Sequence, residues 1–436
     1  MRPLRRVAAV TAALLLAAAA TPRASAGADV DVAALLARIV DARTPDARRT
    51  AAESAARTPG LTLDAALEAA RAFGVFEPQQ AGTLRIDVPG GGAVQVFVPG
   101  GYDPARPTPL ILALHGTGGD GEQALSLWQG FAERNGFLVA APETSGANAG
   151  YTFGEAERDE GWAALRAVRR RLNVDENRIH ATGVSRGGHM TWDLALRRPD
   201  VFASLAPMIG GPRLDFSRGS NNTRFVENVA HLPIRDLQGE QDDPRLLANL
   251  RMVFARLEAL HAPDARLVTF AELGHSFDPS AVDWDAFLGG ARREPWPERV
   301  VVRGAAPGVR SHFAEIAGVE RDVVVDFRPR VDAKTWPSLG EDAQRRVVAE
   351  QIEAATARLE VRRTARGRYE ATSDGVTGFR LLLPAEGVGE DGRVVVRWKG
   401  RDLALRAEPS LAVLLRDFAE RFDRTSLVVC EVRVGR

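Results

Sequence analysis

The chain has 436 residues, of which 45% are hydrophobic and 26% are charged, as in an ordinary globular protein, which excludes a disordered or fibrous chain. Its 57 basic and 57 acidic residues give a formal net charge of zero, so nothing indicates a nucleic-acid-binding surface, and we expect no nucleic-acid partner. The length exceeds that of one typical hydrophobic core, so we expect two or more domains.

Residues 1–26 have the three parts of a secretory signal peptide. Arginines at positions 2, 5 and 6 come before an apolar run, Val7–Ala20, and Ala24-Ser25-Ala26 follows it. The apolar run has 14 residues, fewer than the roughly 20 that a membrane-spanning helix requires. We therefore predict cleavage after Ala26 rather than a membrane anchor. We also expect export to the periplasm or the extracellular space, with no stable membrane span after cleavage.

Residues 27–80 are rich in alanine and carry leucine and isoleucine at helical spacing. Thr62-Leu63-Asp64 is typical of a helix start within this stretch. The pattern predicts a helical leader region, which either packs on the domain that follows it or serves as a spacer. None of its residues suggests chemistry.

Residues 81–290 are predicted to form an α/β domain. Two alternating strands, Thr83–Val88 and Ala93–Val98, flank a Pro-Gly-Gly-Gly segment, which indicates an antiparallel hairpin. Apolar strands then alternate with helical patterns. The strands are predicted at 110–114, 137–141, 178–182, 202–208, 234–237 and 267–270, and the helices at about 121–134, 156–171, 187–197, 244–260 and 279–289. This alternation is typical of a mostly parallel sheet with helices on both faces.

A charged, proline-containing segment, 291–299, is predicted to be a linker to a small, mainly β C-terminal domain at 300–436. The strands there are predicted at 300–302, 322–327, 357–362, 378–383, 393–398 and 426–434, with one helix near 410–422. The only cysteine, Cys430, lies in an apolar run, and we expect it to pack in a core. Because one cysteine cannot form an internal disulfide, stability must come from packing.

The motif G-x-S-x-G stands at Gly183–Gly187, between a predicted strand and a predicted helix. Such a strand, sharp turn and helix hold a serine in a strained conformation with its hydroxyl above the sheet. The helix N-terminus also adds positive potential where negative charge develops. We therefore predict that Ser185 is a nucleophile, rather than a surface serine in an ordinary tight turn.

A serine nucleophile needs a base, and His275 is the best placed of the seven histidines. It follows the last predicted strand of the α/β domain, so it lies at the same sheet edge as Ser185. We assign the other six to structural or solvated positions: His115 in a glycine-rich loop, His180 in a strand, His189 on the helix under the elbow, His231 and His261 at loop edges, and His312 in the C-terminal domain.

The acid that orients the base should follow a strand lying between these two residues in sequence. The strand at 234–237 is followed by two adjacent aspartates, Asp242 and Asp243. We prefer Asp242, because Asp243 precedes Pro244 and suits the N-cap of the next helix.

The order Ser185, Asp242, His275 resembles the catalytic triad of the α/β-hydrolases. The resemblance covers about residues 83–290 and is closest to secreted polyhydroxybutyrate depolymerases and feruloyl esterases, and to the catalytic domains of prolyl-oligopeptidase-like peptidases. In those relatives a strand ending in His-Gly is followed by G-x-S-x-G, Gly-x-x-Asp and Gly-His. The same motifs stand here at His115-Gly116, Gly183–Gly187, Gly239–Asp242 and Gly274-His275, and the third supports Asp242 over Asp243.

The resemblance implies an α/β-hydrolase fold and acyl transfer to water. Ser185 would attack the carbonyl carbon, His275 would take its proton, and Asp242 would hold the imidazole. The oxyanion would accept hydrogen bonds from the backbone N–H groups of Thr117 and Arg186. This chemistry needs no organic cofactor and no metal, and the sequence has no H-E-x-x-H motif or Cys/His ligand cluster.

The glycine-rich loop after the strand at 110–114 allows a second interpretation. Gly116, Gly118 and Gly121 fit G-x-G-x-x-G, and Glu143 stands near the position expected for a ribose-binding acid, as in a dinucleotide-binding domain. We prefer the oxyanion hole, because the chain is predicted to be exported, the loop opens with a histidine, and the triad requires such a loop.

The sequence therefore predicts an exported serine hydrolase that cleaves carboxylic esters, including esters linked to polymers or polysaccharides. Two alternatives stay open: a prolyl-oligopeptidase-like serine peptidase, and a non-catalytic envelope- or polysaccharide-binding protein that retains the fold. In the loop 143–155, Tyr151 and Phe153 either line an acyl pocket or simply pack the loop. The oligomeric state is left open.

Overall fold

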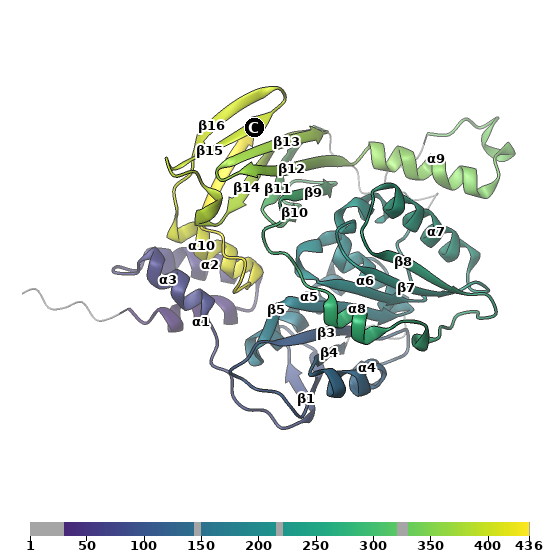
Figure 1. Ribbon diagram of the computed structural model, residues 1–436, viewed down its shortest axis with the longest axis horizontal. Helices are drawn as coiled ribbons and strands as arrows, with labels where there is room; N and C mark the ends of the chain where they lie inside the picture. Colours follow the sequence, from purple (N-terminus) through teal and green to yellow (C-terminus); the bar gives the residue numbers. More distant parts are fainter. Residues whose placement is uncertain (1–29, 144–149, 215–220, 321–329, 436) are drawn as a thin grey trace, which may run out of the picture.

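The computed structural model describes residues 30–143, 150–214, 221–320 and 330–435 (Figure 1). The predicted signal peptide lies outside these residues. None of the helices in the described ranges is long and apolar enough to cross a membrane.

The α/β domain is built on an eight-stranded sheet in the order β1-β2-β4-β3-β5-β6-β7-β8. Its strands are β1 (Gly82–Asp87), β2 (Ala93–Val98), β3 (Thr108–Leu114), β4 (Leu138–Glu143), β5 (Val174–Val184), β6 (Ser204–Met208), β7 (Ile234–Gly239) and β8 (Ala265–Phe270). Within this sheet β2 pairs antiparallel with both β1 and β4, and the pairs from β4 to β8 are parallel. The predicted fold class, a mostly parallel sheet that starts with a hairpin, is confirmed.

Helices cover both faces of this sheet, and each face has its own core. The helices are α4 (Gly121–Asn135), α5 (Glu155–Arg171), α6 (Arg186–Arg197), α7 (Pro244–Ala259) and α8 (Trp284–Gly290). Alternate residues of a strand point to opposite faces, so Leu110 and Leu112 of β3 enter the core under α5 and α6, and Ile111 enters the core under α4 and α8. β3 is therefore buried along its whole length, as packing on both faces requires.

The leader region forms α1 (Val32–Asp41), α2 (Pro45–Ala56) and α3 (Leu63–Arg71). Its buried side chains share one core with residues 300–435, and its helices lie beside α10 (Leu411–Arg421) in Figure 1. The Phe73 ring packs edge-on against those of Phe418 and Phe422, at 5.7 and 5.6 Å between centroids. The prediction of packing on the following domain, or of a spacer, missed this partner, because the matching apolar face comes some 340 residues later in the chain.

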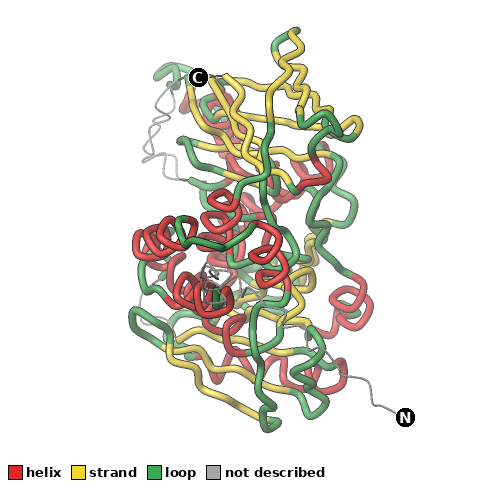
Figure 2. Tube along the Cα trace, turned by 90° about the vertical axis from the view of Figure 1, so that its left-hand side faces the viewer, coloured by secondary structure: helices red, strands yellow, loops and turns green. Residues whose placement is uncertain are grey.

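The C-terminal region has two sheets, β10-β11-β14-β17 and β16-β15-β13-β12-β9. The strands are β9 (Arg299–Gly304), β10 (Arg310–Ser311), β11 (Ala314–Val319), β12 (Ala357–Ala365), β13 (Arg368–Asp374), β14 (Val376–Leu383), β15 (Arg393–Trp398), β16 (Arg401–Arg406) and β17 (Cys430–Gly435). In Figure 2, these strands lie together at the end of the molecule that carries the C-terminus. Cys430 is buried, as expected. The strand predicted at 322–327 lies outside the described residues, and a helix that was not predicted, α9 (Glu341–Ala354), projects beside α7.

Buried ion pairs join this region to the α/β domain. Arg293, in the segment 291–299, is 7% exposed and contacts Asp423 at 2.6 Å. Arg303 of β9 contacts Glu227 at 2.7 Å, and Arg421 pairs with Asp200. The segment 291–299 therefore contributes to the contact between the two regions.

Candidate active site

Ser185 occupies a sharp turn between β5 and α6, with φ 56° and ψ −112°. The turn has no room for side chains at its glycines. A Cβ on Gly187 would lie 2.0 Å from the carbonyl oxygen of Leu114, and one on Gly183 would lie 2.4 Å from the backbone of Gly187. The Ser185 N–H donates to the Met208 carbonyl at 2.8 Å. Crowding on every side thus holds the serine in a conformation that non-glycine residues rarely adopt.

The structure brings Ser185, His275 and Asp242 together in one hydrogen-bonded chain. His275 Nε2 lies 2.8 Å from Ser185 Oγ, and His275 Nδ1 lies 2.8 Å from Asp242 Oδ2. The carboxylate of Asp242 also accepts hydrogen bonds from Gln238 Nε2 at 2.8 Å and from the Asp243 N–H at 2.7 Å. Burial opposes ionisation of Asp242, but the hydrogen bonds that its carboxylate accepts outweigh burial, so its pKa lies below the usual value.

Asp243 has a different role, because its carboxylate accepts a hydrogen bond from the Arg245 N–H at 2.9 Å. It is the N-cap of α7, with Pro244 at the first helical position. Gly239 lets the loop that carries Asp242 meet the loop that carries His275, since a Cβ there would lie 1.9 Å from the Gly274 carbonyl oxygen. Close packing of the two loops therefore sets which aspartate reaches the histidine.

The glycine-rich loop after β3 approaches the serine. A Cβ on Gly116 would lie 3.3 Å from the Val184 carbonyl oxygen and 3.7 Å from the Ser185 Cβ. Thr117 follows in this loop and Arg186 is the first residue of α6, so the backbone of both runs close to Ser185. The oxyanion hole at the N–H groups of Thr117 and Arg186 stays a prediction.

The contacts of Glu143 argue against the dinucleotide-binding interpretation of the glycine-rich loop. Its carboxylate accepts hydrogen bonds from the Gly121 N–H and from Gln95 Nε2, both at 3.3 Å. A Cβ on Gly121 would lie 2.8 Å from the Ala141 carbonyl oxygen, so this glycine lets α4 approach β4. The acid and the third glycine both serve packing within the sheet domain.

A cavity of about 780 Å³ opens beside Asp242 and His275. Tyr151 and Phe153 line it, with ring centroids 4.6 Å apart, and the Tyr151 hydroxyl donates to Asp193 at 3.0 Å. The rest of the loop at 144–149 lies outside the described residues. A volume of this size suits a small-molecule ligand.

His189 also lines this cavity, although the sequence predicts it under the elbow and away from the hydroxyl. Its Nδ1 lies 2.6 Å from the Gly211 carbonyl oxygen, and its ring centroid lies 5.7 Å from that of Phe153. Burial lowers its pKa. His189 thus forms part of the cavity wall, while His275 makes the contact with Ser185.

The C-terminal region supplies one wall of the same cavity through α9. Arg345 Nη1 donates to Asn249 of α7 at 2.7 Å, and Arg345 Nη2 donates to Glu341 at 2.7 Å. Val348 and Ile352 of α9 pack with Leu214. Sequence reasoning missed this wall, although acidic residues at the start of the helix and an i, i+4 apolar pair were available as a signal.

Gln238 is a second functional position that sequence reasoning missed. It is fully buried and donates to Asp242, and its position directly after the predicted strand 234–237 was the available signal. Among the described residues, no group of three His, Cys, Asp or Glu side chains could hold a metal ion.

No family model matches the chain. The chain is 35% identical over 135 residues to poly(3-hydroxyalkanoate) depolymerase C of Paucimonas lemoignei, covering 28% of this chain and 32% of that protein. It is 33% identical over 123 residues to feruloyl esterase C of Emericella nidulans, covering 26% and 44%. It is 35% identical over 198 residues to the putative esterase NocK of Nocardia uniformis subsp. tsuyamanensis, covering 40% and 52%.

The chain thus spans about half or less of the length of these relatives. Among solved structures, a thermostable esterase is similar at 24% identity and a TM-score of 0.38, covering 48% of this chain and 63% of that one. The relatives that match by sequence are esterases and a depolymerase, and the sheet is the one their resemblance implies. The sheet therefore has the α/β-hydrolase architecture that the sequence predicts.

Proposed function

We propose that this chain is an exported serine esterase that hydrolyses carboxylic esters through an acyl-enzyme. The observation that carries the proposal is the hydrogen-bonded chain from Asp242 through His275 to Ser185, with both contacts at 2.8 Å. Relatives named as esterases and as a depolymerase support the ester bond as the target. The pattern of residues 1–26 supports export.

Catalysis would begin when His275 Nε2 takes the Ser185 proton as the oxygen attacks the ester carbonyl. Ionised Asp242 would hold the imidazole in the required tautomer and stabilise its positive form. The N–H groups of Thr117 and Arg186 would receive the oxyanion. His275 would then donate its proton to the leaving alcohol, and water would release the acid from Ser185 by the same steps.

The substrate would occupy the 780 Å³ cavity between the loop of Tyr151 and Phe153 and the α9 wall. The paired rings favour a flat or compact acyl group, because aromatic faces stack well against planar groups. Glu341 and Arg345 also line the cavity. Polymer-linked esters would then enter as a chain end or a side group.

A hydrolysis screen tests this function. Purified protein would be given short-acyl, long-acyl, feruloyl and acetylated-sugar esters beside peptide amides, with the Ser185→Ala variant as background. We expect turnover of at least one ester class, with amides at background. Amide cleavage without ester cleavage would instead support the peptidase interpretation, and no turnover of any substrate would contradict the enzyme.

A further inference from the structure

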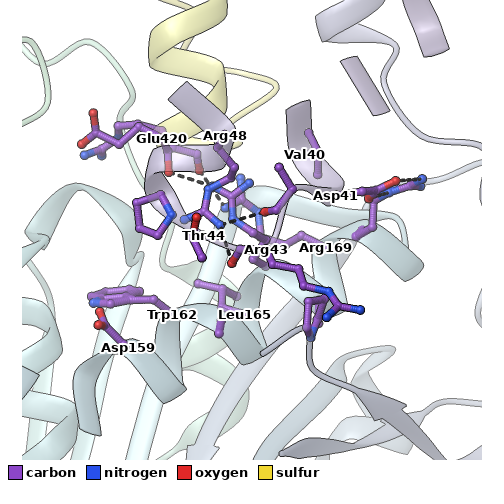
Figure 3. Close-up of a pocket in the computed structure, with 18 of the residues that line it drawn as sticks. Val40, Asp41, Arg43, Thr44, Arg48, Asp159, Trp162, Leu165, Arg169 and Glu420 are labelled. Atoms are coloured by element: carbon purple, nitrogen blue, oxygen red, sulfur yellow. Dashed lines mark hydrogen bonds and ion pairs between the residues drawn. The ribbon is translucent and has the colours of Figure 1, made fainter. Parts of the chain in front are cut away.

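A second cavity, of about 460 Å³, lies where the leader region, α5 and α10 meet (Figure 3). Ser185, Asp242 and His275 do not line it. Its walls come from parts of the chain that are distant in sequence: the α1–α2 segment, α5 and the end of α10, together with Pro89, Arg198 and Val201. The cavity is therefore a separate site formed by the packing of the leader on the rest of the molecule.

One side of this cavity is apolar. Val40, Trp162 and Leu165 face into it in Figure 3, and Pro45, Pro89 and Val201 also line it. A carbon-containing ligand would gain about 25 cal/mol for each Å² of apolar surface removed from water there.

The other side carries three guanidinium groups that form no direct ion pair among the described residues, although Asp159, Asp200 and Glu420 lie near enough to interact electrostatically with them. Arg48 Nη1 donates to the Ala42 carbonyl at 3.2 Å, and Arg166 Nη2 donates to the carbonyls of Ala419 and Glu420 at 2.9 and 2.8 Å. Arg198 stacks on Trp162, with its guanidinium carbon 4.8 Å from the ring centre. Within the described part of the chain, no carboxylate lies within ion-pair distance of these three groups.

Two neighbouring arginines, unlike these three, form ion pairs with carboxylates. Arg170 contacts Asp41 at 2.7 Å, and the buried Arg169 contacts Glu176. Arg48 Nε and Arg166 Nη1 are buried nitrogens without a hydrogen-bond partner in the described chain, as is Arg169 Nε, but Arg169 also has the Glu176 carboxylate beside it. Buried polar groups of this kind are normally paired.

Like charges make this positive cluster unfavourable on its own. Burial, reinforced by Arg48, Arg169 and Arg198, lowers the pKa of Arg166 to about 9. Asp159 and Glu420 also line the cavity, but burial raises the pKa of Asp159, which weakens it as a counter-charge at low pH. An anion entering the cavity would be attracted by the cluster and would relieve its repulsion.

We propose that this cavity binds a compact organic carboxylate, with the carboxylate group at Arg48 and Arg166 and the apolar body against Trp162 and Leu165. Guanidinium groups match the geometry of a carboxylate and can bind both of its oxygens. The apolar wall favours an organic acid over a bare oxyanion such as phosphate. Binding here does not depend on the proposed ester hydrolysis.

Titration calorimetry with benzoate and with inorganic phosphate tests this site. We expect benzoate to bind the wild-type chain at least ten times more tightly than phosphate. Arg48→Gln and Arg166→Gln should each weaken benzoate binding at least tenfold. Arg48 is partly exposed at the cavity, so its variant keeps the test valid even where Arg166→Gln does not fold.

Arg49→Gln is the matched control, because Arg49 is an exposed residue of the same helix as Arg48, pairs with Asp46 and does not line the cavity. It should leave benzoate binding unchanged, and quenching of tryptophan fluorescence by benzoate should follow the same order of variants. Absence of benzoate binding, unchanged binding in folded Arg48→Gln, or loss of binding in Arg49→Gln would overturn the site. Phosphate binding as tight as benzoate binding would overturn the organic carboxylate as its ligand.

Discussion

The carboxyl edge of the eight-stranded sheet and its contact with the C-terminal region use polar groups in opposite ways. At the sheet edge, the side chain of His275 is 52% exposed. The short motifs around it contain glycines that let neighbouring backbone segments approach closely. At the contact, Arg293 is buried and pairs with Asp423, 130 residues away in the chain. The first arrangement leaves a reactive group accessible, and the second ties distant segments together.

This difference teaches which features a sequence can reveal. A motif such as Gly183–Gly187 is visible because a local backbone geometry demands it. A buried ion pair such as Arg293–Asp423 is invisible, since neither residue is unusual until the fold places them together. Substitutions on each side of the comparison should therefore affect different properties, namely rate at the sheet edge and stability at the contact.

The largest expected effect is at the sheet edge. His275→Ala should lower kcat/KM for an ester by at least about 1000-fold, because His275 Nε2 is the base in hydrogen-bond contact with Ser185 Oγ. His189→Ala should stay within about tenfold, since His189 bonds to Gly211 and only lines the cavity. Steady-state kinetics on both variants checks this, and a larger loss in His189→Ala than in His275→Ala would reverse the assignment of the base.

The next effect is on stability at the contact. Arg293→Ala leaves Asp423 buried without its partner, and we expect a loss of about 3–5 kcal/mol in the free energy of unfolding. The neighbouring Arg292 pairs with Asp175 at an exposed position, so Arg292→Ala should change that free energy by about 1 kcal/mol or less. Urea denaturation measures both, and equal changes would contradict a special role for the buried pair.

A smaller effect is expected at the cavity beside His275, where α9 meets the α/β domain. Arg345→Ala removes the bonds to Asn249 and Glu341 and should raise KM for a bulky acyl ester by about tenfold, with little change in kcat for an acetate ester. Arg346→Ala, on the exposed side of the same helix, is the control. Identical behaviour of the two variants on both esters would show that α9 does not shape the cavity.

The smallest expected effect is the loss of folding stability at low pH. Burial opposes ionisation of Asp200, but nearby guanidiniums, first Arg421, outweigh burial and hold its pKa at about 2. Because the folded pKa lies below the unfolded value of about 3.8, the stabilisation is complete above pH 4 and is lost as the pH falls towards 2. The Tm of Asp200→Asn should fall less steeply than that of the wild-type chain across this range, and parallel curves would exclude Asp200 as a source of acid sensitivity.

The sequence predicts the sheet domain well, because alternating apolar strands and helical periods are local signals. It also predicts the three residues that the structure brings together, since each stands beside a glycine or at a strand end. It does not predict that the leader packs with α10, because that requires matching two apolar faces at opposite ends of the chain. The α9 wall was missed for the same reason, since its partner Leu214 lies in another region.

The central claim is that Ser185 is an activated nucleophile, and covalent labelling tests it most directly. A fluorophosphonate probe should label the folded wild-type chain, with the modification mapped by mass spectrometry to Ser185. Ser185→Ala should abolish labelling, whereas Ser126→Ala, at an exposed serine of α4, should not. A folded wild-type chain that stays unlabelled, or one labelled at another residue, would contradict the claim.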